Sequence, residues 1–210
     1  MDIKNLRVDY NKNRIDFNNI LKDPMDYFNL WFKEALQTEI NEANSCVLST
    51  VDSLNNPNSR VVLLKYIEEN SFVFFTNYDS AKSRDILKNN NVALNFYWGT
   101  LERQVRINGC AERISELNSD QYFNERPKKS QLSTLISKQS SNINLSCDLN
   151  LDMKQLEEKY KGKTIKRPSN WGGFKVIPKR IEFWQGRPSR LHDRLVYTFD
   201  QNWAVKRLAP

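Results

Sequence analysis

The sequence predicts a mainly β fold, an antiparallel barrel with peripheral α-helices. Two observations support this prediction. Short runs of β-branched and aromatic residues follow one another closely, and turn-forming Asn, Asp, Gly and Pro residues separate them. Segments with helical periodicity are short and lie between those runs, and no internal repeat is found. A chain of 210 residues with 39% hydrophobic residues is long enough to bury one substantial core.

The N-terminal part contains the first predicted helix. Residues 1–22 are polar and rich in Asn and Lys, so we expect a flexible segment, followed by a single domain over residues 23–210. Asp23 can cap free N–H groups and Pro24 is favoured at the first helical position, so a helix should begin here. Apolar side chains at helical spacing continue this helix to about Glu42.

The remaining elements are predicted from composition in the same way. Runs of β-forming residues predict strands over Cys46–Val51, Arg60–Tyr66, Phe72–Thr76, Val92–Trp98, Arg103–Ile114, Phe174–Trp184, Arg194–Phe199 and Trp203–Arg207. Helical spacing predicts helices from Ser80 to about Asn89 and over Ser115–Asn124, Lys128–Lys138 and Leu151–Tyr160. The polar residues 139–150 should form a loop.

Composition limits the function classes. The net charge of +7 is compatible with nucleic-acid binding, with a site for small phosphorylated ligands, or with a generally basic surface. The lysines are spread along the chain without a long basic tail, which argues against nucleic acid. Three cysteines without metal-ligand spacing and one histidine argue against a disulfide framework and a metal site. No apolar run predicts a membrane span or a signal peptide, so we expect a cytoplasmic protein.

The stretch Arg190-Leu191-His192-Asp193-Arg194 contains the one histidine of the chain. If this stretch is a strand, Arg190, His192 and Arg194 share one face, because strand side chains alternate. Cationic groups crowded on one surface repel each other unless an anion joins them, and an imidazole can exchange a proton near neutral pH. The stretch is therefore either an anion-binding site or a solvated basic edge strand.

Longer blocks resemble a known family. The run Glu182–Gly186, the Arg-Leu-His-Asp-Arg stretch and the ending Arg207–Pro210 together resemble the C-terminal signature of the pyridoxine/pyridoxamine 5'-phosphate oxidase family. Further blocks match in family order: Arg60–Lys65, Phe74–Tyr78, Arg103–Gly109, Tyr122–Pro127 and Trp171–Gly173. Each block alone is a weak signal. Together they cover nearly the whole chain and are very specific.

This resemblance implies an antiparallel FMN-binding split barrel, used as a homodimer with active sites at the subunit interface. It implies FMN as cofactor and oxidation of pyridoxamine 5'-phosphate or pyridoxine 5'-phosphate by O₂ to pyridoxal 5'-phosphate and hydrogen peroxide. Three alternatives stay open: a split-barrel flavoprotein with another substrate, a nucleic-acid-binding protein, and a non-catalytic protein that binds pyridoxal phosphate or FMN. The resemblance favours neither nucleic acid nor a membrane as a partner.

Two local patterns in the first half of the chain suit phosphate groups. Lys82 follows Ser80 in the first turn of a predicted helix, where free N–H groups and the helix dipole favour an anion. An ordinary surface lysine is the alternative, and the family has Arg where this chain has Ala81. Arg60 and Lys65 lie five residues apart, so strand alternation should put them on opposite faces. The resemblance directs Arg60 to the FMN phosphate and Lys65 to the substrate phosphate.

A third pattern lies in the middle of the chain. Tyr122, Arg126 and Ser130 are spaced four and four, so they would share one stripe of a continuous helix, although Pro127 interrupts it. Two hydroxyls and a guanidinium form a reasonable phosphate cradle, and a helix end with a stray arginine is the alternative. The resemblance favours the cradle. Gln104 can both donate and accept hydrogen bonds, which suits the edge of a flavin ring.

The resemblance assigns the complete set of site residues. To FMN it assigns Arg60, Val61, Val62, Leu63, Leu64, Lys65, Phe75, Thr76, Lys82, Gln104, Gln139, Ser140, Trp184 and Arg194. To the substrate it assigns Arg7, Tyr10, Lys65, Tyr122, Arg126, Ser130, Arg190, Leu191 and His192, with Arg190 and His192 as the catalytic residues. The N-terminal segment would then fold over the substrate as a lid.

Overall fold

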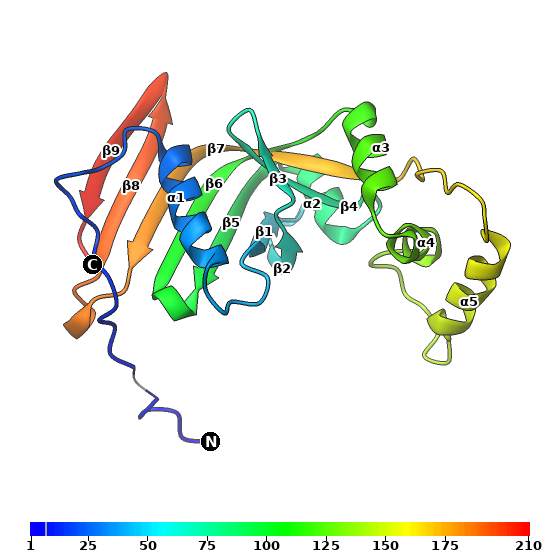
Figure 1. Ribbon diagram of the computed structural model, residues 1–210, viewed down its shortest axis with the longest axis horizontal. Helices are drawn as coiled ribbons and strands as arrows, with labels where there is room; N and C mark the ends of the chain where they lie inside the picture. The colour runs from blue at the N-terminus through cyan, green and yellow to red at the C-terminus, as the bar shows by residue number, and fades with distance from the viewer. Residues whose placement is uncertain (7) are drawn as a thin grey trace.

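The computed structural model describes residues 1–6 and 8–210 of the chain. Within these residues, nine strands form one sheet, and paired strands run antiparallel (Figure 1). The strands are β1 (Ser45–Val51), β2 (Pro57–Leu63), β3 (Tyr66–Glu68), β4 (Ser71–Asn77), β5 (Asn91–Trp98), β6 (Arg103–Arg113), β7 (Trp171–Gln185), β8 (Asp193–Asp200) and β9 (Asn202–Leu208). Their order is β2-β1-β5-β6-β7-β4-β3, while β8 pairs with β7 and β9. The predicted mainly β class is confirmed.

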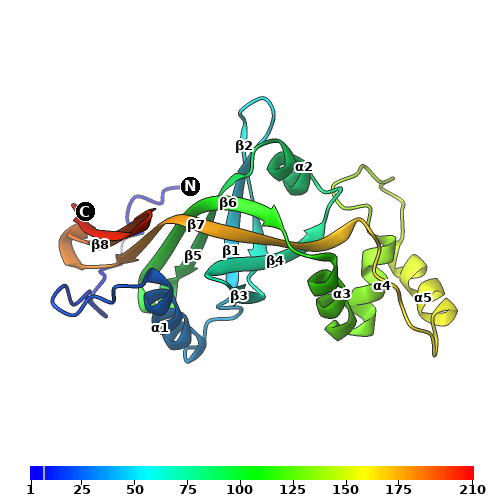
Figure 2. The ribbon, with the colours of Figure 1, turned by 90° about the horizontal axis from the view of Figure 1, so that it is seen from above.

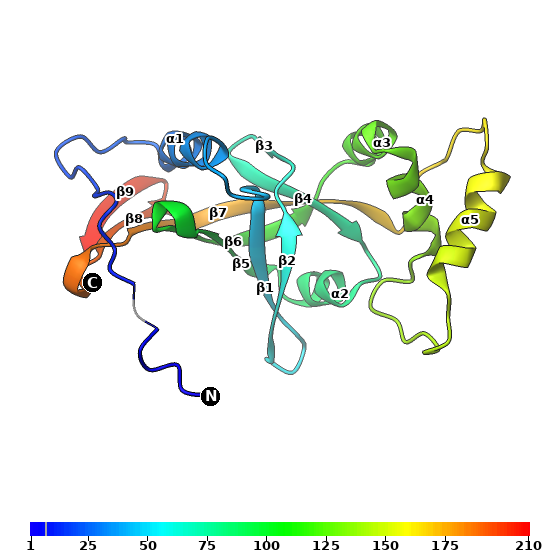
Figure 3. The ribbon, with the colours of Figure 1, turned by 60° about the horizontal axis from the view of Figure 1, so that its bottom comes forward.

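The α-helices lie at the periphery of this sheet. In the described part of the chain they are α1 (Pro24–Leu36), α2 (Ala81–Lys88), α3 (Glu116–Glu125), α4 (Lys128–Ile136) and α5 (Leu149–Lys159). Figures 1 and 2 show α3, α4 and α5 together at one end of the molecule, and β8, β9 and the C-terminus at the other. Figure 3 shows α1 and α2 on opposite sides of the strands. No helix among the described residues combines the length and apolar character needed to cross a membrane.

Strand β7 connects the two ends of the molecule. β6 runs beside most of β7, the first part of β7 pairs with β4, and the last part pairs with β8. The register of β6 against β7 shifts at a bulge between Asn108 and Gly109. A Cβ atom at Gly109 would lie 2.1 Å from the carbonyl oxygen of Ile177, so only glycine permits this close approach. The bulge therefore lets one long strand take part in both halves of the sheet.

Helix α1 closes one side of the core. The side chain of Asp23 accepts a hydrogen bond from the N–H of Met25, and Pro24 begins the helix, as predicted. Phe28 is fully buried, with its ring centroid 4.9 Å from that of Phe72 and 5.2 Å from that of Phe96. Burial of one such side chain contributes about 1.5–3 kcal/mol. The apolar face of α1 thus anchors the helix on β4 and β5.

The end of α1 differs from the prediction. The helix ends at Leu36 rather than near Glu42. The hydroxyl of Thr38 donates to the carbonyl oxygen of Ala35 at 2.7 Å and so replaces a helical backbone bond. This local competition ends the helix although the apolar spacing continues.

The predicted continuous strand Arg60–Tyr66 is wrong at Leu64 and Lys65. β2 ends at Leu63, and β3 begins at Tyr66. Between them, the N–H of Leu64 donates to Asn44 and the N–H of Lys65 donates to Val73, both at 2.8 Å. The chain therefore leaves β1 and joins β4 at this point, and strand alternation cannot be carried from Arg60 to Lys65.

The N-terminal segment has no helix or strand in residues 1–6 and 8–22. Its second half is nevertheless attached to the sheet. The N–H of Lys12 donates to Glu102 Oε2 at 3.0 Å, and the N–H of Ile15 donates to Asp193 Oδ2 at 3.2 Å. Ile15 is buried in the core. These contacts place Tyr10 beside the end of β7.

Candidate active site

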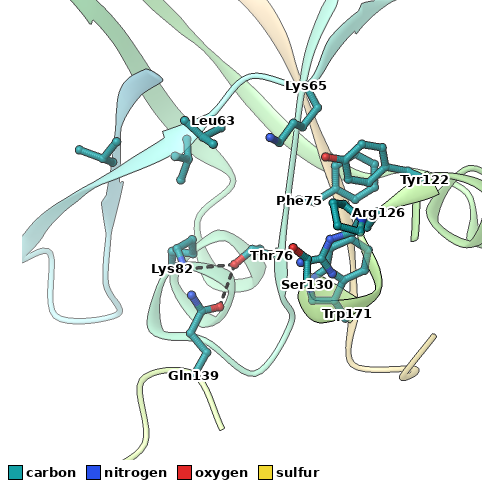
Figure 4. A pocket seen from close by; sticks show the side chains of 13 residues that line it. Leu63, Lys65, Phe75, Thr76, Lys82, Tyr122, Arg126, Ser130, Gln139 and Trp171 are labelled. Carbon is teal, nitrogen blue, oxygen red and sulfur yellow. Dashed lines mark hydrogen bonds between the residues drawn. The ribbon is translucent and has the colours of Figure 1, made fainter. Parts of the chain in front are cut away.

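A cavity of about 360 Å³ opens between the C-terminal part of β2, β4 and the helices α2, α3 and α4 (Figure 4). We call it the β4 cavity. Its walls are formed by Val61, Val62, Leu63, Lys65, Phe75, Thr76, Lys82, Tyr122, Arg126, Pro127, Ser130, Gln139 and Trp171. A cavity of this size suits a small organic ligand or cofactor. Eleven of these residues carried a predicted role, and the structure brings them together from distant parts of the sequence.

Lys82 forms one end of the β4 cavity. It lies in the first turn of α2, and its side chain is buried. Lys82 Nζ donates to Thr76 Oγ1 at 3.0 Å, and the Thr76 hydroxyl donates to Gln139 Oε1 at 3.1 Å (Figure 4). Lys82 Nζ also donates to Ser80 Oγ at 3.3 Å. Burial, followed by the charge of Arg60, lowers the pKa of Lys82 to about 8. A buried ammonium in this state would be stabilised by an anion.

Arg60 supports this end from behind the cavity wall. Its NH1 donates to Thr50 Oγ1 at 2.6 Å, and its NH2 lies 3.7 Å from Asp85 Oδ2. Burial lowers the pKa of Arg60, and the charge of Asp85 opposes this effect. The guanidinium does not line the cavity in this chain, but its charge acts on Lys82. Asp85 therefore partly balances the charge of Arg60.

Arg126 forms the opposite end of the cavity. α3 ends at Glu125 and α4 begins at Lys128, so Tyr122, Arg126 and Ser130 do not share one helix. They still line the same cavity, because the turn at Pro127 keeps the two helices adjacent. Arg126 NH1 donates to Thr134 Oγ1 at 2.7 Å, and burial lowers the pKa of Arg126. Lys65 also lines this cavity, and Figure 4 shows it near Tyr122.

Three aromatic rings form the wall beside Arg126. Phe75 stacks on Tyr122 with 3.9 Å between ring centroids and on Trp171 with 5.3 Å. The guanidinium of Arg126 lies 4.5 Å from the centroid of Trp171, in cation–π geometry. The sequence alone assigns Trp171 no site role, although its Trp-Gly-Gly run matches a family block. A Cβ at Gly172 would lie 2.2 Å from the Tyr78 hydroxyl, so only glycine permits this close approach next to Trp171.

A second cavity lies at the other end of β7, and we call it the His192 cavity. It has a volume of about 790 Å³ and is lined by Leu6, Val8, Asp9, Tyr10, Trp184, Arg187, Ser189, Arg190 and His192. Tyr10 and Trp184 pack around the imidazole, with ring centroids 5.7 Å and 4.6 Å from that of His192. The predicted grouping of Tyr10, Arg190 and His192 is therefore found.

The strand conformation considered for Arg190–Arg194 is not found at residues 190–192. Pro188–Arg190 forms a single 3₁₀ turn, and β8 begins at Asp193. Ser189 and Arg190 have φ angles of 56° and 61°, which are incompatible with a strand. Arg190 and His192 therefore meet through a turn, while Leu191 is exposed and does not line the cavity.

His192 has a defined hydrogen-bonding arrangement. The N–H of Arg187 donates to Nδ1 at 3.1 Å, so the proton of the neutral imidazole resides on Nε2. Burial and then the charge of Arg190 lower the pKa of His192, against the opposing charge of Asp193. The neutral ring with a free Nε2–H donor is thus the form that this surrounding favours near pH 7.

Gln104, Trp184 and Arg194 form a row across β6, β7 and β8, because each is the register partner of the next. Arg194 Nε donates to Glu182 Oε1 at 2.9 Å, and its NH1 donates to the carbonyl oxygen of Ala209 at 3.0 Å. Burial favours the neutral carboxyl, but hydrogen bonds from arginine side chains outweigh it and lower the pKa of Glu182. The carboxylate of Glu182 thereby fixes Arg194 beside the His192 cavity.

The two cavities lie far apart on one chain. Trp171 is the first residue of β7 and lines the β4 cavity, while Trp184 is near the end of this 15-residue strand and lines the His192 cavity. At about 3.3 Å per residue, the two tryptophans are roughly 40 Å apart. The structure therefore divides the predicted site residues into two groups that no small ligand can contact together on one copy.

The remaining predicted residues lie outside both cavities. Leu64 is buried in the core, and Ser140 lines a separate surface hollow beside Gln139. Arg7 lies outside the described residues. In the part of the chain that is described, no group of three or more His, Cys, Asp or Glu side chains could hold a metal ion.

Comparisons with known proteins place the chain in a family. A family profile described as pyridoxamine 5'-phosphate oxidase matches residues 32–185, and one described as pyridoxine 5'-phosphate oxidase C-terminal dimerisation region matches residues 171–210. A pyridoxine/pyridoxamine 5'-phosphate oxidase of Legionella pneumophila (strain Paris) is 46% identical over 209 residues, which cover 99% of this chain and 97% of the relative. One of Burkholderia thailandensis is 44% identical, with 99% of each chain covered.

Solved structures show the same fold. PhzG from Burkholderia lata 383, in complex with tetrahydrophenazine-1-carboxylic acid, matches with a TM-score of 0.89 and 24% identity, over 95% of this chain and 100% of that one. A pyridoxamine 5'-phosphate oxidase-related, FMN binding protein from Nostoc punctiforme matches with a TM-score of 0.73 and 16% identity, over 90% and 98%. These likenesses confirm the predicted split barrel. With the two profiles and the full-length relatives, they show that the chain belongs to the pyridoxine/pyridoxamine 5'-phosphate oxidase family.

Proposed function

We propose that this chain is an FMN-dependent oxidase. It would convert pyridoxamine 5'-phosphate or pyridoxine 5'-phosphate to pyridoxal 5'-phosphate, with O₂ as acceptor and hydrogen peroxide as second product. The observation that carries the proposal is that the β4 cavity has a separate buried or half-buried cation at each end, Lys82 and Arg126. Among the described residues, neither has a carboxylate partner within 4.0 Å. Two phosphorylated ligands held side by side would supply both missing anions.

The Lys82 end fits the phosphate of FMN. An ammonium whose pKa is lowered by burial regains a stable charge when a phosphate dianion binds, and the hydroxyl of Thr76 and the amide of Gln139 can add hydrogen bonds. Arg60 would add its positive charge near the phosphate without lining the cavity. Bound FMN would supply the redox chemistry, uptake of a hydride equivalent from the substrate and reoxidation by O₂. Two full-length relatives that carry the oxidase name, at 46% and 44% identity, support oxidase chemistry for this chain.

The Arg126 end fits the substrate phosphate. Arg126 and Lys65 can neutralise it, while the hydroxyls of Tyr122 and Ser130 can donate hydrogen bonds. A phosphate fixed here would hold the reacting carbon at one defined place in the cavity. Binding energy from a remote group is in this way converted into alignment.

The chemistry requires a second copy of the chain. Arg190 and His192 lie roughly 40 Å from the β4 cavity along β7, so the cavity of one copy would face the His192 cavity of the other. A match to a dimerisation region over residues 171–210 supports a homodimer. His192 would then donate from Nε2–H to the substrate, because its Nδ1 is occupied by the N–H of Arg187. Arg190 would add positive charge at the same place.

The spectrum and products of the purified protein test this function. We expect absorption bands of an oxidised flavin, release of FMN and not FAD on denaturation, and one hydrogen peroxide per pyridoxal 5'-phosphate formed. Colourless protein that FMN cannot reconstitute would contradict the flavoenzyme. Yellow protein that binds pyridoxal 5'-phosphate without turnover would instead identify a non-catalytic binding protein.

Replacement of Lys82 with methionine should weaken FMN binding by about tenfold to a hundredfold, the usual loss for one charge-assisted hydrogen bond to phosphate. FMN affinity of the wild type should fall as the pH rises through about 8, because the ligand-free protein then loses the proton of Lys82. The phosphate itself does not titrate in this range, since its second pKa is about 6. Fluorescence titration of apoprotein with FMN from pH 7 to 9.5 measures both effects.

Lys88→Met is the matched control, because Lys88 is exposed in the last turn of the same helix. It should retain both the affinity and the pH dependence. If Lys82→Met showed the same fall in affinity above pH 8 as the wild type, another group would be responsible for it.

A further inference from the structure

Arg167 is a buried arginine outside both cavities. It lies in the loop before β7, and its side chain is only 6% exposed. Nε donates to Asp120 Oδ1 at 2.6 Å, and NH2 pairs with Glu116; both acceptors are on α3. NH1 donates to the carbonyl oxygens of Trp171 and Pro168. One guanidinium thus connects α3 to the start of β7.

These two elements carry the Arg126 end of the β4 cavity. Tyr122 is on α3, and Arg126 follows directly after that helix. Trp171 is the first residue of β7, and its ring contacts Phe123 of α3 at 5.4 Å between centroids and supports Arg126 at 4.5 Å. A shift of α3 against β7 would therefore move the guanidinium of Arg126 and the hydroxyl of Tyr122 relative to each other.

The stability that its ion pairs contribute does not by itself explain why the side chain of Arg167 is buried. The side chains of Glu116 and Asp120 are 72% and 54% exposed, and salt bridges to exposed carboxylates contribute little stability. What distinguishes the residue is geometry. A planar guanidinium can serve two carboxylates on one side and two carbonyl oxygens on the other at once, whereas a lysine ammonium is a single point charge.

We propose that Arg167 is a positioning residue for the substrate phosphate. By fixing Trp171 against α3, it holds Arg126 and Tyr122 at the separation that a phosphate requires, without contacting the ligand. This inference rests on the proposed function, because it takes the Arg126 end of the β4 cavity as the place where the substrate phosphate binds.

The test compares Arg167→Lys with Arg103→Lys. Arg103 is an equally buried arginine, 7% exposed, that pairs with Glu34 and lies 4.4 Å from the ring centroid of Trp31, far from the Arg126 end. The same substitution therefore removes a similar set of contacts elsewhere. For each variant we would measure KM and kcat for pyridoxine 5'-phosphate, the dissociation constants of pyridoxal 5'-phosphate and FMN, and the melting temperature.

Arg167→Lys should raise KM and the dissociation constant of pyridoxal 5'-phosphate by about tenfold, as expected when binding groups are displaced by less than 1 Å. kcat and FMN binding should change less than about twofold, since the Lys82 end is not connected to Arg167. Arg103→Lys should lower the melting temperature without either change in phosphate-ligand affinity.

A lower melting temperature of Arg167→Lys with unchanged KM and unchanged affinity for pyridoxal 5'-phosphate would overturn the proposal and leave Arg167 a purely structural residue. Equal losses in KM, kcat and FMN binding would also overturn it, because they indicate general disruption. If wild-type protein with FMN bound did not bind pyridoxal 5'-phosphate, the proposed function would fail together with this inference.

Discussion

Replacement of Arg190 or His192 with alanine should lower kcat/KM for pyridoxine 5'-phosphate by tenfold or more, with FMN still bound, each factor of ten being about 1.4 kcal/mol of lost transition-state stabilisation. Both residues line the His192 cavity, and neither is near the Lys82 end that we assign to the FMN phosphate. Steady-state kinetics with the flavin content determined for each variant measures this effect. Wild-type kinetics in both variants would remove the pair from the active site.

The pH profile gives an independent measure of His192. Burial and Arg190 lower its pKa, so the imidazole is neutral above the usual value of about 6.5 and gains a proton only in more acidic solution. The protonated ring would add a cation beside Arg190. We therefore expect kcat/KM to fall as the pH decreases below about 6.5, and the fall to be absent in His192→Asn. An identical acid limb in the variant would assign the titration to another group.

Replacement of Arg126 with methionine should have an equally large effect through binding of the substrate phosphate. Loss of a charge-assisted contact in a half-buried cradle costs about 1.5–3 kcal/mol, which corresponds to about tenfold to a hundredfold in kcat/KM. Arg126→Lys should recover only part of this, because lysine cannot both stack on Trp171 and donate to Thr134 in the same way. Kinetics with pyridoxine 5'-phosphate and with unphosphorylated pyridoxine separates the contributions. An equal loss for both substrates would contradict a phosphate-specific role.

A mixture of the two kinds of inactive subunit tests the shared site directly. If one copy supplies Arg126 and the other supplies His192, a heterodimer of Arg126→Met and His192→Ala has one site with both changes and one intact site. When equal amounts of the two variants re-associate at random, half of the dimers are heterodimers, and each has one intact site out of two. The mixture should therefore regain about a quarter of the wild-type activity. Absence of any recovery, with heterodimers shown to form, would mean that each copy carries its complete site.

Much of the local structure could be predicted from the sequence because its signals are local. Asp23 and Pro24 mark a helix start whatever the rest of the chain does, since capping and a fixed φ angle act within one turn. The alternating burial of β5 similarly follows from its pattern of large apolar residues, with Val92, Leu94, Phe96 and Trp98 buried. The gathering of Tyr122, Arg126 and Ser130 at one cavity also agrees with their spacing, although two helices form it.

The predictions are wrong where contacts with residues distant in the sequence determine the local structure. β2 ends at Leu63 because Lys65 finds its hydrogen-bond partner in Val73, and no local pattern indicates that exchange. The Arg190–His192 stretch is a turn with positive φ at two non-glycine residues, a conformation that the sequence does not favour. Trp171 is part of the cavity wall because it stacks on Phe75, which is far away in the sequence.

The sequence by itself determined the fold class, the family and the identities of the residues that can bind phosphate, because amino-acid type and short-range periodicity carry that information. Only the tertiary structure decided which of those residues share a cavity. The 15 residues of β7 separate Trp171 from Trp184 by roughly 40 Å, so Lys82 and Arg126 lie in one cavity while Arg190 and His192 lie in another. Distances between residues remote in the chain depend on strand pairing and helix packing, and these exist only in the folded molecule.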